Sequence, residues 1–470
     1  MVYEKWYQKI CDWTDAHAEE MAADLQRIAR VKSVSRADLA EDGAPFGPDC
    51  RKMLDVMLER VREFGFETDD NGGWYGDAWI GDRKTAVGII GHLDVVPEGS
   101  DWKYPPYAAT RVGDFLIGRG VSDNKSACVA GLYLMRMMRE LGVPMKTGVR
   151  AVFGVSEETG MADLKHMVDE GKQPPVSLVL DGMFPVNYAQ KSHMTGWSSI
   201  ELGEKLKAFS GGDVPNSVPA YAEALLAVSA QQARAALGGE IEVREAEGGC
   251  IAAARGVAAH VAKPETGRSA TLLLARALES SGLLDETSRR AMHAVAVMCS
   301  DTTGAHAGIA YRDEASGETT MVCGAAYTAD GRVWLSLDCR LAVTADREAN
   351  AESYRALAGE LGMKVEKLNV GKPFYMPVDD ARVRALCEIY YRLTGDETKP
   401  YAMGGGTYSG VVPNGITFGM GFPGRNARPD IPEGHGTAHK ADEFIYLPNL
   451  VEAFKIVACA VLELDAMHDA

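Results

Sequence analysis

The sequence predicts an α/β fold with a mostly parallel sheet, interrupted by an inserted α+β domain. Three short apolar strands, at 85–92, 149–156 and 176–182, alternate with helical patterns at 126–142 and 161–171. This alternation is typical of a parallel sheet covered by helices on both faces. After Pro185 the pattern becomes a mixture of alternating strands and helices, and near residue 376 the first style returns.

The remaining elements follow from periodicity. Apolar residues recur at three- and four-residue spacing in the N-terminal part, which predicts helices over 4–30 and 49–66. The other predicted elements are strands at 195–203, 332–343 and 415–422 and helices at 221–237, 352–362 and 379–395. We therefore expect one discontinuous α/β domain, 1–185 plus 376–470, and an α+β insertion, 186–375, long enough for two similar halves.

Composition excludes several classes of protein. Asp and Glu number 66 against 49 Lys and Arg, and the net charge of −17 disfavours nucleic acid and anionic membranes as partners. No apolar stretch approaches the ~18 residues needed to span a bilayer, and the N-terminus has no signal-peptide pattern. The nine cysteines are odd in number and form no C-x-x-C pair, which predicts reduced thiols and a cytoplasmic protein.

Residue types that bind metal ions follow the three apolar strands. His92 and Asp94 end the first strand region, Glu157 and Glu158 follow the second, and Asp181 lies at the end of the third. The carboxyl ends of parallel strands share one crevice, so these side chains are expected to meet there. Asp123 lies at the start of the helix predicted over 126–142.

Each of these residues also has an ordinary explanation. Asp123 could cap its helix, Glu157 and Glu158 could lie on a surface turn, Asp181 could belong to an Asp-Gly turn, and His92 could be a core histidine. Together, however, clustered carboxylates repel one another unless cations neutralise them. Imidazole and carboxylate ligands without thiolates favour a catalytic site for zinc or a related divalent ion, and two ions bridged by a carboxylate are a recurring hydrolytic arrangement.

Five segments resemble the metal-site motifs of the M20 metallopeptidase family, and in particular its PepV-like dinuclear zinc dipeptidases. They occur in the same order over nearly the whole chain: GHLDVVP (91–97), GRGVSDNKSA (118–127), GVSEETG (154–160), LDGMFPV (180–186) and HKADEF (439–444). The resemblance implies a zinc-peptidase-like catalytic domain with an inserted lid domain.

The resemblance also implies roles for single residues. One metal ion would be held by His92, Asp123 and Asp181, and a second by Asp123, Glu158 and His439, with Asp123 bridging. Asp94 would orient the imidazole of His92, and Glu157 would be the general base that takes a proton from the attacking water. The Asp123–Asn124 peptide bond is expected to be cis. The C-terminal motif also contains His435, but the pattern H-x-A-[DN]-E-F selects His439.

The insertion carries further resemblances. Residues 256–270 are similar to the family segment whose histidine, here His260, stabilises the oxyanion; this chain has Ser269 where the family usually has Asn. NSVPA (216–220) points to Asn216 as a substrate contact. GGGTYSG (404–410) resembles the family's glycine loop, which implies that Gly405, Gly406 and Thr407 approach the substrate. A packed histidine and a plain flexible turn are the ordinary alternatives.

Arg340 lies inside a predicted strand, where an arginine needs a partner. It suits a bidentate clamp on the C-terminal carboxylate of a substrate. A structural pairing with Asp338 is the alternative, because residues two apart share one face of a strand.

The sequence as a whole predicts a dipeptidase that uses two divalent metal ions, with zinc expected and Mn or Co as alternatives. Asp rather than Glu at position 181 accompanies aminopeptidase and dipeptidase activity in the family. The substrate would be a small peptide, of Xaa-His, β-alanyl or broader type, and the long lid favours a monomer. The alternatives are another M20 activity, such as an N-acyl amino acid deacylase or a carboxypeptidase, and a non-catalytic metal- or peptide-binding protein, which would lack a ligand or the base.

Overall fold

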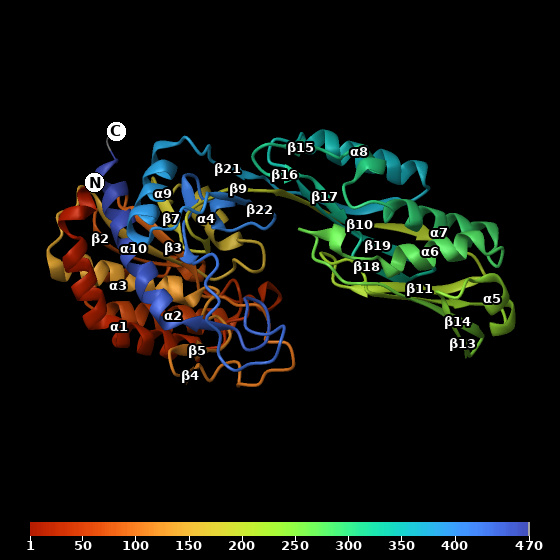
Figure 1. The fold of residues 1–470 in the computed structure, drawn as a ribbon, viewed down its shortest axis with the longest axis horizontal. Coiled ribbons are helices and arrows are strands. Elements are labelled where there is room, and N and C mark those ends of the chain that lie inside the picture. Colours follow the sequence, from red (N-terminus) through yellow and green to blue (C-terminus); the bar gives the residue numbers. More distant parts are fainter. Residues whose placement is uncertain (469–470) are drawn as a thin grey trace. The chain divides into compact units, whose positions relative to one another are not determined.

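The computed structural model describes residues 1–468, which fold into two compact units (Figure 1). The first unit contains Met1–Tyr188, Met376–Tyr401 and residues 407–468, and the second contains Ala189–Tyr375 and Ala402–Gly406. The short segment Ala402–Gly406 thus groups with the insertion, although the sequence analysis assigned it to the α/β domain. The reason is local: the backbone oxygen of Gly404 accepts a hydrogen bond from Arg340 of the second unit.

Most strands of the first unit lie in a sheet with the strand order β1-β2-β6-β3-β7-β23-β9-β21, in which β22 also pairs with β9. The residues of β21, and parts of β9 and β22, are grouped with the second unit. The pairs β6–β3, β3–β7 and β7–β23 are parallel, whereas β1, β2, β9 and β21 pair antiparallel. The strands are β1 (Glu67–Asp69), β2 (Gly76–Gly81), β3 (Val87–His92), β6 (Gly148–Gly154), β7 (Ser177–Val179), β9 (Asn187–Gln190), β21 (Phe374–Tyr375), β22 (Tyr401–Met403) and β23 (Gly415–Thr417).

Helices cover both faces of the parallel strands, as the continuous apolar strands predict. Ile89 and Ala151 face α3, whereas the next residues along their strands, Ile90 and Val152, pack in a cluster with Leu164 of α4. The helices of this unit are α1 (Tyr7–Ala29), α2 (Pro48–Glu63), α3 (Lys125–Leu141), α4 (Ala162–Asp169), α9 (Ala381–Thr394) and α10 (Leu447–Ala466). The mixed α/β fold with parallel strands is therefore confirmed.

Short elements complete the first unit. A three-stranded antiparallel sheet joins β4 (Thr110–Val112), β5 (Phe115–Ile117) and β25 (Phe444–Tyr446), and β8 (Gly182–Met183) pairs with β24 (Met420–Gly421). The 3₁₀ turns are η1 (Val2–Lys5), η2 (Ala37–Leu39), η3 (Asn71–Gly73) and η6 (Tyr408–Gly410).

The second unit contains an antiparallel sheet in the order β13-β14-β12-β11-β18-β19-β10-β20, with β17 paired to β19. Sheet residues such as Met194, Phe209 and Leu335 share one apolar core with the helices, including Leu274 and Val295. Its strands are β10 (Ser192–Glu201), β11 (Leu206–Asp213), β12 (Tyr221–Leu226), β13 (Glu242–Ala246), β14 (Gly249–Arg255), β15 (Arg312–Asp313), β16 (Gly317–Glu318), β17 (Thr320–Val322), β18 (Ala325–Ala329), β19 (Arg332–Leu341) and β20 (Lys364–Val370). Its helices are α5 (Ala230–Ala236), α6 (Ala270–Ser280), α7 (Glu286–Met298) and α8 (Arg347–Glu360), with turns η4 (Pro264–Thr266) and η5 (Ala305–Ala307).

The helix predicted over 221–237 is wrong in its first half. Tyr221–Leu226 forms β12, which is paired with β11 and β14, and the helix begins only at Ala230, after its cap Ser229. Alternate residues of β12 are buried, so its side chains follow the strand period of two. Six residues are too few for periodicity alone to separate the two states, and pairing with distant strands decided between them.

Two expectations from composition can be compared with the structure. All nine cysteines are free thiols. Among residues 1–468, none of the helices combines the length and the apolar character that crossing a membrane requires.

Candidate dinuclear metal centre

Loops at the carboxyl ends of the parallel strands bring the predicted metal-binding residues together. His92 is the last residue of β3 and lies opposite Gly154 of β6, so the two strands end level with each other. The loop after β6 carries Glu157 and Glu158, and the chain after β7 carries Asp181. Among residues 1–468, potential ligand atoms lie within 4.8 Å of one another in three groups: His92, Asp123 and Asp181; Asp123, Glu158 and His439; and His92, Glu157 and Glu158.

Asp123 lies between two histidines. Its Oδ1 is 3.1 Å from Nε2 of His92, and its Oδ2 is 3.1 Å from Nε2 of His439. His439 Nε2 is also 3.0 Å from Oε1 of Glu158, and His92 Nε2 is 4.0 Å from Oδ2 of Asp181. Asp123 does not cap the following helix, because the N-cap residue of α3 is Asn124. The two groups that share Asp123 have the composition of two neighbouring metal sites bridged by one carboxylate.

Electrostatics in this cluster favour bound cations. Burial and the charge of Asp123 raise the pKa of Asp181 to about 7, and burial raises the pKa of Glu157 well above its usual value. Hydrogen bonds to Asp123 and Glu158 raise the pKa of His439 to about 10. Positive charge at the ring nitrogens therefore compensates the carboxylates, which is the role a divalent cation would take. Imidazole nitrogen and carboxylate oxygen are ligands that suit Zn²⁺ and related ions.

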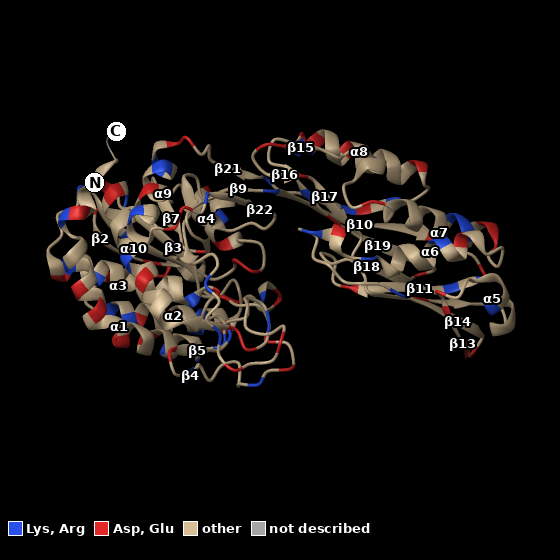
Figure 2. Ribbon diagram, in the orientation of Figure 1, with Lys and Arg blue, Asp and Glu red and all other residues tan. Residues whose placement is uncertain are grey.

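This cluster accounts for only a small part of the net charge of −17. Figure 2 shows Asp and Glu distributed over helices and loops of both units. The cluster matters because its carboxylates are buried beside one another, where repulsion is weakly screened.

Asp94 contacts His92 with its backbone oxygen and, at a longer distance, with its carboxylate. Nδ1 of His92 donates to the backbone oxygen of Asp94 at 2.9 Å, whereas the nearer carboxylate oxygen is 3.5 Å away. The carboxylate instead accepts the backbone N–H groups of Glu157 and Glu158, each at 3.1 Å. The main chain of Asp94 thus orients the imidazole, and its side chain holds the turn that carries the two glutamates.

Asn124 connects three of the loops and was missed by sequence reasoning. Its side-chain oxygen accepts the backbone N–H of His92 at 3.1 Å, and its amide nitrogen donates to Leu180 O at 2.8 Å and to Asp181 Oδ1 at 3.2 Å. The Asp123–Asn124 peptide bond is cis, as expected. The position of Asn124 directly after Asp123 in the DNK motif was the available signal.

Asp163 and Tyr408 are a second pair that the sequence analysis missed. Oδ2 of Asp163 accepts the backbone N–H groups of Val155 and Ser156, at 2.7 and 2.9 Å, and the hydroxyl of Tyr408 at 2.5 Å. Both side chains are fully buried, and burial raises the pKa of Asp163 to about 6. The strand end before Glu157 is therefore held by one carboxylate and the turn itself by another.

The two C-terminal histidines are separated by their contacts. His435 Nδ1 is 2.7 Å from Asp442 Oδ2, and the carboxylate of Asp442 also accepts backbone N–H groups of Lys103 and Tyr104. His439 contacts Asp123 and Glu158 instead. Of the two, only His439 belongs to a candidate ligand group.

The second unit brings Asn216 and His260 side by side. The backbone oxygen of Asn216 accepts the N–H of Val261 at 2.9 Å, and Ser217 and His260 form an isolated β-bridge. His260 is exposed, and its Nδ1 accepts the N–H of Ala262 at 3.2 Å. The two segments that resemble substrate-binding motifs therefore form one surface of this unit.

Arg340 is paired with Asp338, the alternative left open by the sequence. Its Nε and Nη2 donate to the two carboxylate oxygens of Asp338, at 2.6 and 3.0 Å. Nη1 donates to Gly404 O at 2.9 Å and lies 2.6 Å from Nε2 of His193. The two-pronged side of the guanidinium is thus already used, so a bidentate substrate clamp does not fit this arrangement.

The glycine loop and Ser269 also have definite contacts. Gly405 and Gly406 are half-buried, whereas Thr407 is buried, with its hydroxyl 2.9 Å from that of Thr417 and accepting the N–H of Ser409. The side chain of Thr407 therefore holds the loop that follows the glycines. Ser269 caps α6 by accepting the N–H of Leu272.

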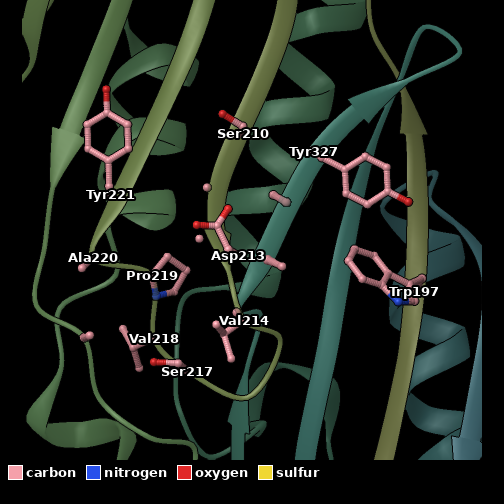
Figure 3. Close-up of a pocket in the computed structure, with 16 residues that line it drawn as sticks. Trp197, Ser210, Asp213, Val214, Ser217, Val218, Pro219, Ala220, Tyr221 and Tyr327 are labelled. Atoms are coloured by element: carbon pink, nitrogen blue, oxygen red, sulfur yellow. The ribbon is translucent and has the colours of Figure 1, made fainter. Parts of the chain in front are cut away.

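A cavity of about 510 Å³ lies on the second unit next to the Asn216 segment. Ser217 and Val218 line it together with Trp197, Tyr327 and Asp213 (Figure 3). Within the described residues, the groups that could hold a metal ion all lie elsewhere, at the strand ends of the first unit.

Comparison with known proteins places this geometry in a family. The chain is 27% identical over 471 residues to a protein of Bacillus subtilis (strain 168) named "Putative dipeptidase YtjP", covering 95% of this chain and 97% of that one. The di-peptidase Dug1p of Saccharomyces cerevisiae has a similar structure, with a TM-score of 0.59, 14% identity and 99% of each chain covered. Human carnosine dipeptidase 1 gives a TM-score of 0.57 at 16% identity, covering 98% of this chain and 99% of that one. The family described as Peptidase family M20/M25/M40 matches residues 88–463, and the chain therefore belongs to this family of peptidases.

Proposed function

We propose that this peptidase is a dipeptidase that uses two divalent metal ions, zinc in the first place, with Mn or Co as alternatives. One observation carries the proposal: His92 and Asp181 on one side, and Glu158 and His439 on the other, form two ligand groups that share Asp123. Ions held by these residues would supply Lewis-acid chemistry, polarising a scissile carbonyl and making a water molecule more acidic.

Glu157 is the proposed general base. It shares a group with His92 and Glu158, and its backbone N–H is fixed by Asp94. Burial raises the pKa of its carboxyl above the usual value, which makes the carboxylate a stronger base toward water. Its role is to take a proton from the attacking water and deliver it to the amine.

Residues of the second unit and the glycine loop are proposed to bind the substrate. His260 would stabilise the oxyanion, and Asn216, whose segment pairs with that of His260, would contact the peptide. Gly405, Gly406 and Thr407 would offer backbone groups to the substrate. For Thr407 only the backbone is available, because its hydroxyl is engaged with Thr417. Arg340 would act indirectly: Asp338 engages its Nε and Nη2, and its Nη1 holds the glycine loop through Gly404 O.

The proposed substrates are dipeptides, of Xaa-His, β-alanyl or broader type. The dipeptidase name of the relative that matches nearly the whole length of the chain supports this class. The free thiols support a cytoplasmic protein, and the long insertion supports a monomer.

The test is hydrolysis of a dipeptide panel by protein loaded with Zn²⁺, Mn²⁺ or Co²⁺, compared with N-acyl amino acids and with longer peptides. We expect dipeptides to be cleaved fastest. Glu157→Gln should lower kcat by about 10²- to 10⁴-fold, whereas Glu170→Gln, on the exposed end of α4, should leave kcat unchanged. Cleavage of N-acyl amino acids alone, or of long peptides alone, would replace the dipeptidase assignment by a deacylase or a carboxypeptidase. Absence of any hydrolysis would favour a binding protein.

A further inference from the structure

Arg119 and Glu443 form a fully buried ion pair beside the candidate metal centre. Nη1 of Arg119 lies 2.8 Å from Oε2 of Glu443, and the two side chains are 1% and 0% exposed. Burying two charges is costly unless good geometry and further hydrogen bonds compensate, so a buried pair is weak evidence for stability alone. The other contacts of the pair indicate what it does.

Glu443 binds the backbone of the loop that carries Asp123. Its Oε1 accepts the N–H groups of Ser122 and Asp123, at 2.9 and 3.0 Å. Its Oε2 accepts the N–H of Gly120 at 3.1 Å in addition to the guanidinium of Arg119. One carboxylate therefore fixes three backbone groups of the Gly120–Asp123 loop.

Arg119 binds the loop that carries His439. Its Nη1 also donates to the backbone oxygen of Lys440 at 3.2 Å, one residue after His439. Its Nη2 donates to Glu98 O at 3.3 Å in the chain that leaves β3, and its guanidinium lies over the ring of Trp102 at 5.1 Å. Arg119 and Glu443 thus connect two loops that are more than three hundred residues apart in sequence.

We propose that the Arg119–Glu443 pair is a positioning pair that fixes Asp123 and His439 relative to each other and thereby shapes the second metal site. The inference rests on the proposed function, since Asp123 and His439 are ligands only if the centre binds metal. Within the described part of the chain, neither Arg119 nor Glu443 belongs to a candidate ligand group, so their effect on metal binding is indirect. Groups that orient ligands typically change metal affinity by about 10- to 100-fold when they are replaced.

The experiment compares Glu443→Gln with the wild type and with Asp465→Asn. Asp465 is a matched control, because it is a buried carboxylate that accepts the backbone N–H groups of Lys146 and Thr147, in a loop without candidate ligands. Apo protein is titrated with Zn²⁺ alone in a calorimeter. We expect two Zn²⁺-binding steps in the wild type. In Glu443→Gln, the weaker of these two steps should lose about 10- to 100-fold in affinity, whereas the Zn²⁺ affinities of Asp465→Asn should equal those of the wild type.

Amide hydrogen exchange of the apo proteins provides a readout that needs no metal. Glu443→Gln should speed exchange about tenfold in both the 119–124 and the 436–443 segments, whereas Asp465→Asn should speed it only near 146–148. If Glu443→Gln does not fold, Arg119→Lys replaces it in both the Zn²⁺ titration and the exchange experiment. This variant keeps the positive charge but loses the separate contacts that Nη1 and Nη2 make with Glu443 and Glu98 O.

The outcomes separate the two ideas. Unchanged affinity and unchanged exchange in 436–443 would overturn the positioning role, and so would an equal loss of affinity in Asp465→Asn. If the wild type bound no Zn²⁺, the proposed metal function would fail, while the exchange data would still decide whether the pair couples the two loops.

Discussion

Replacing Asp94 by Asn distinguishes the role that the structure gives this residue from the role expected from its sequence position. The imidazole of His92 donates to the backbone oxygen of Asp94, which the substitution keeps. The two carboxylate oxygens accept the backbone N–H groups of Glu157 and Glu158, one each. An asparagine can satisfy only one of these two donors, because its amide nitrogen would face the other.

The magnitude follows from these two hydrogen bonds. A hydrogen bond to a charged acceptor contributes about 1.5–3 kcal/mol, so Asp94→Asn should lower the unfolding free energy by about 2 kcal/mol. Asp94→Ala removes both acceptors and should cost about twice as much. The turn that carries Glu157 and Glu158 would then be less fixed, and the catalytic rate should fall by about 10- to 100-fold.

The assay combines denaturant unfolding, dipeptide hydrolysis and the imidazole ¹⁵N spectrum of His92. Stability and kcat should both fall while the Nδ1 resonance of His92 keeps its hydrogen-bonded position. A shifted Nδ1 resonance with unchanged stability would refute the reasoning, because it would return Asp94 to the role of orienting the ring through its carboxylate.

Three further predictions concern metal, pH and a helix cap. Protein freed of metal by a chelator should unfold at a lower temperature than Zn²⁺-loaded protein, because a ligand at one hundred times its Kd stabilises the folded state by about 2.7 kcal/mol. Equal unfolding temperatures in calorimetry would contradict a metal centre. The folded-state pKa of Asp163, about 6, lies above its usual 3.8, so the folded state holds a proton that the unfolded state releases between these values. The contribution of Asp163 to the unfolding free energy is therefore largest below pH 3.8 and falls by about 3 kcal/mol as the pH rises from 3.8 to about 6. The check is the difference in unfolding free energy between the wild type and Asp163→Asn in urea; a difference that does not change with pH would contradict the prediction. Ser269→Ala should destabilise the second unit by about 1 kcal/mol in calorimetry, because the variant loses the cap of α6. Ser269→Asn should keep the stability, because both Ser and Asn cap helices. A loss of activity without a loss of stability would show that Ser269 acts on the substrate instead.

Local sequence was sufficient to predict an element where its apolar pattern directly reflects the burial of its own residues. The apolar runs of β3 and β6 predict strands buried on both faces, and the carboxyl ends of such strands meet at one edge. That rule predicts that His92, Glu157 and Asp181 lie together. Local sequence was insufficient for Tyr221–Leu226, because six residues fit both the helical and the strand period. Pairing with β11 and β14 made this segment a strand.

The sequence by itself determined which chemical groups reach the site, because residue type and strand ends are local properties. Only the tertiary structure decided which atom of each group meets which partner. Asp94 holds the His92 ring with its backbone oxygen and the glutamate turn with its carboxylate, Arg340 is paired with Asp338, and Glu443 binds the Asp123 loop. Such contacts depend on how loops far apart in the chain pack against one another, and no short-range periodicity encodes that packing.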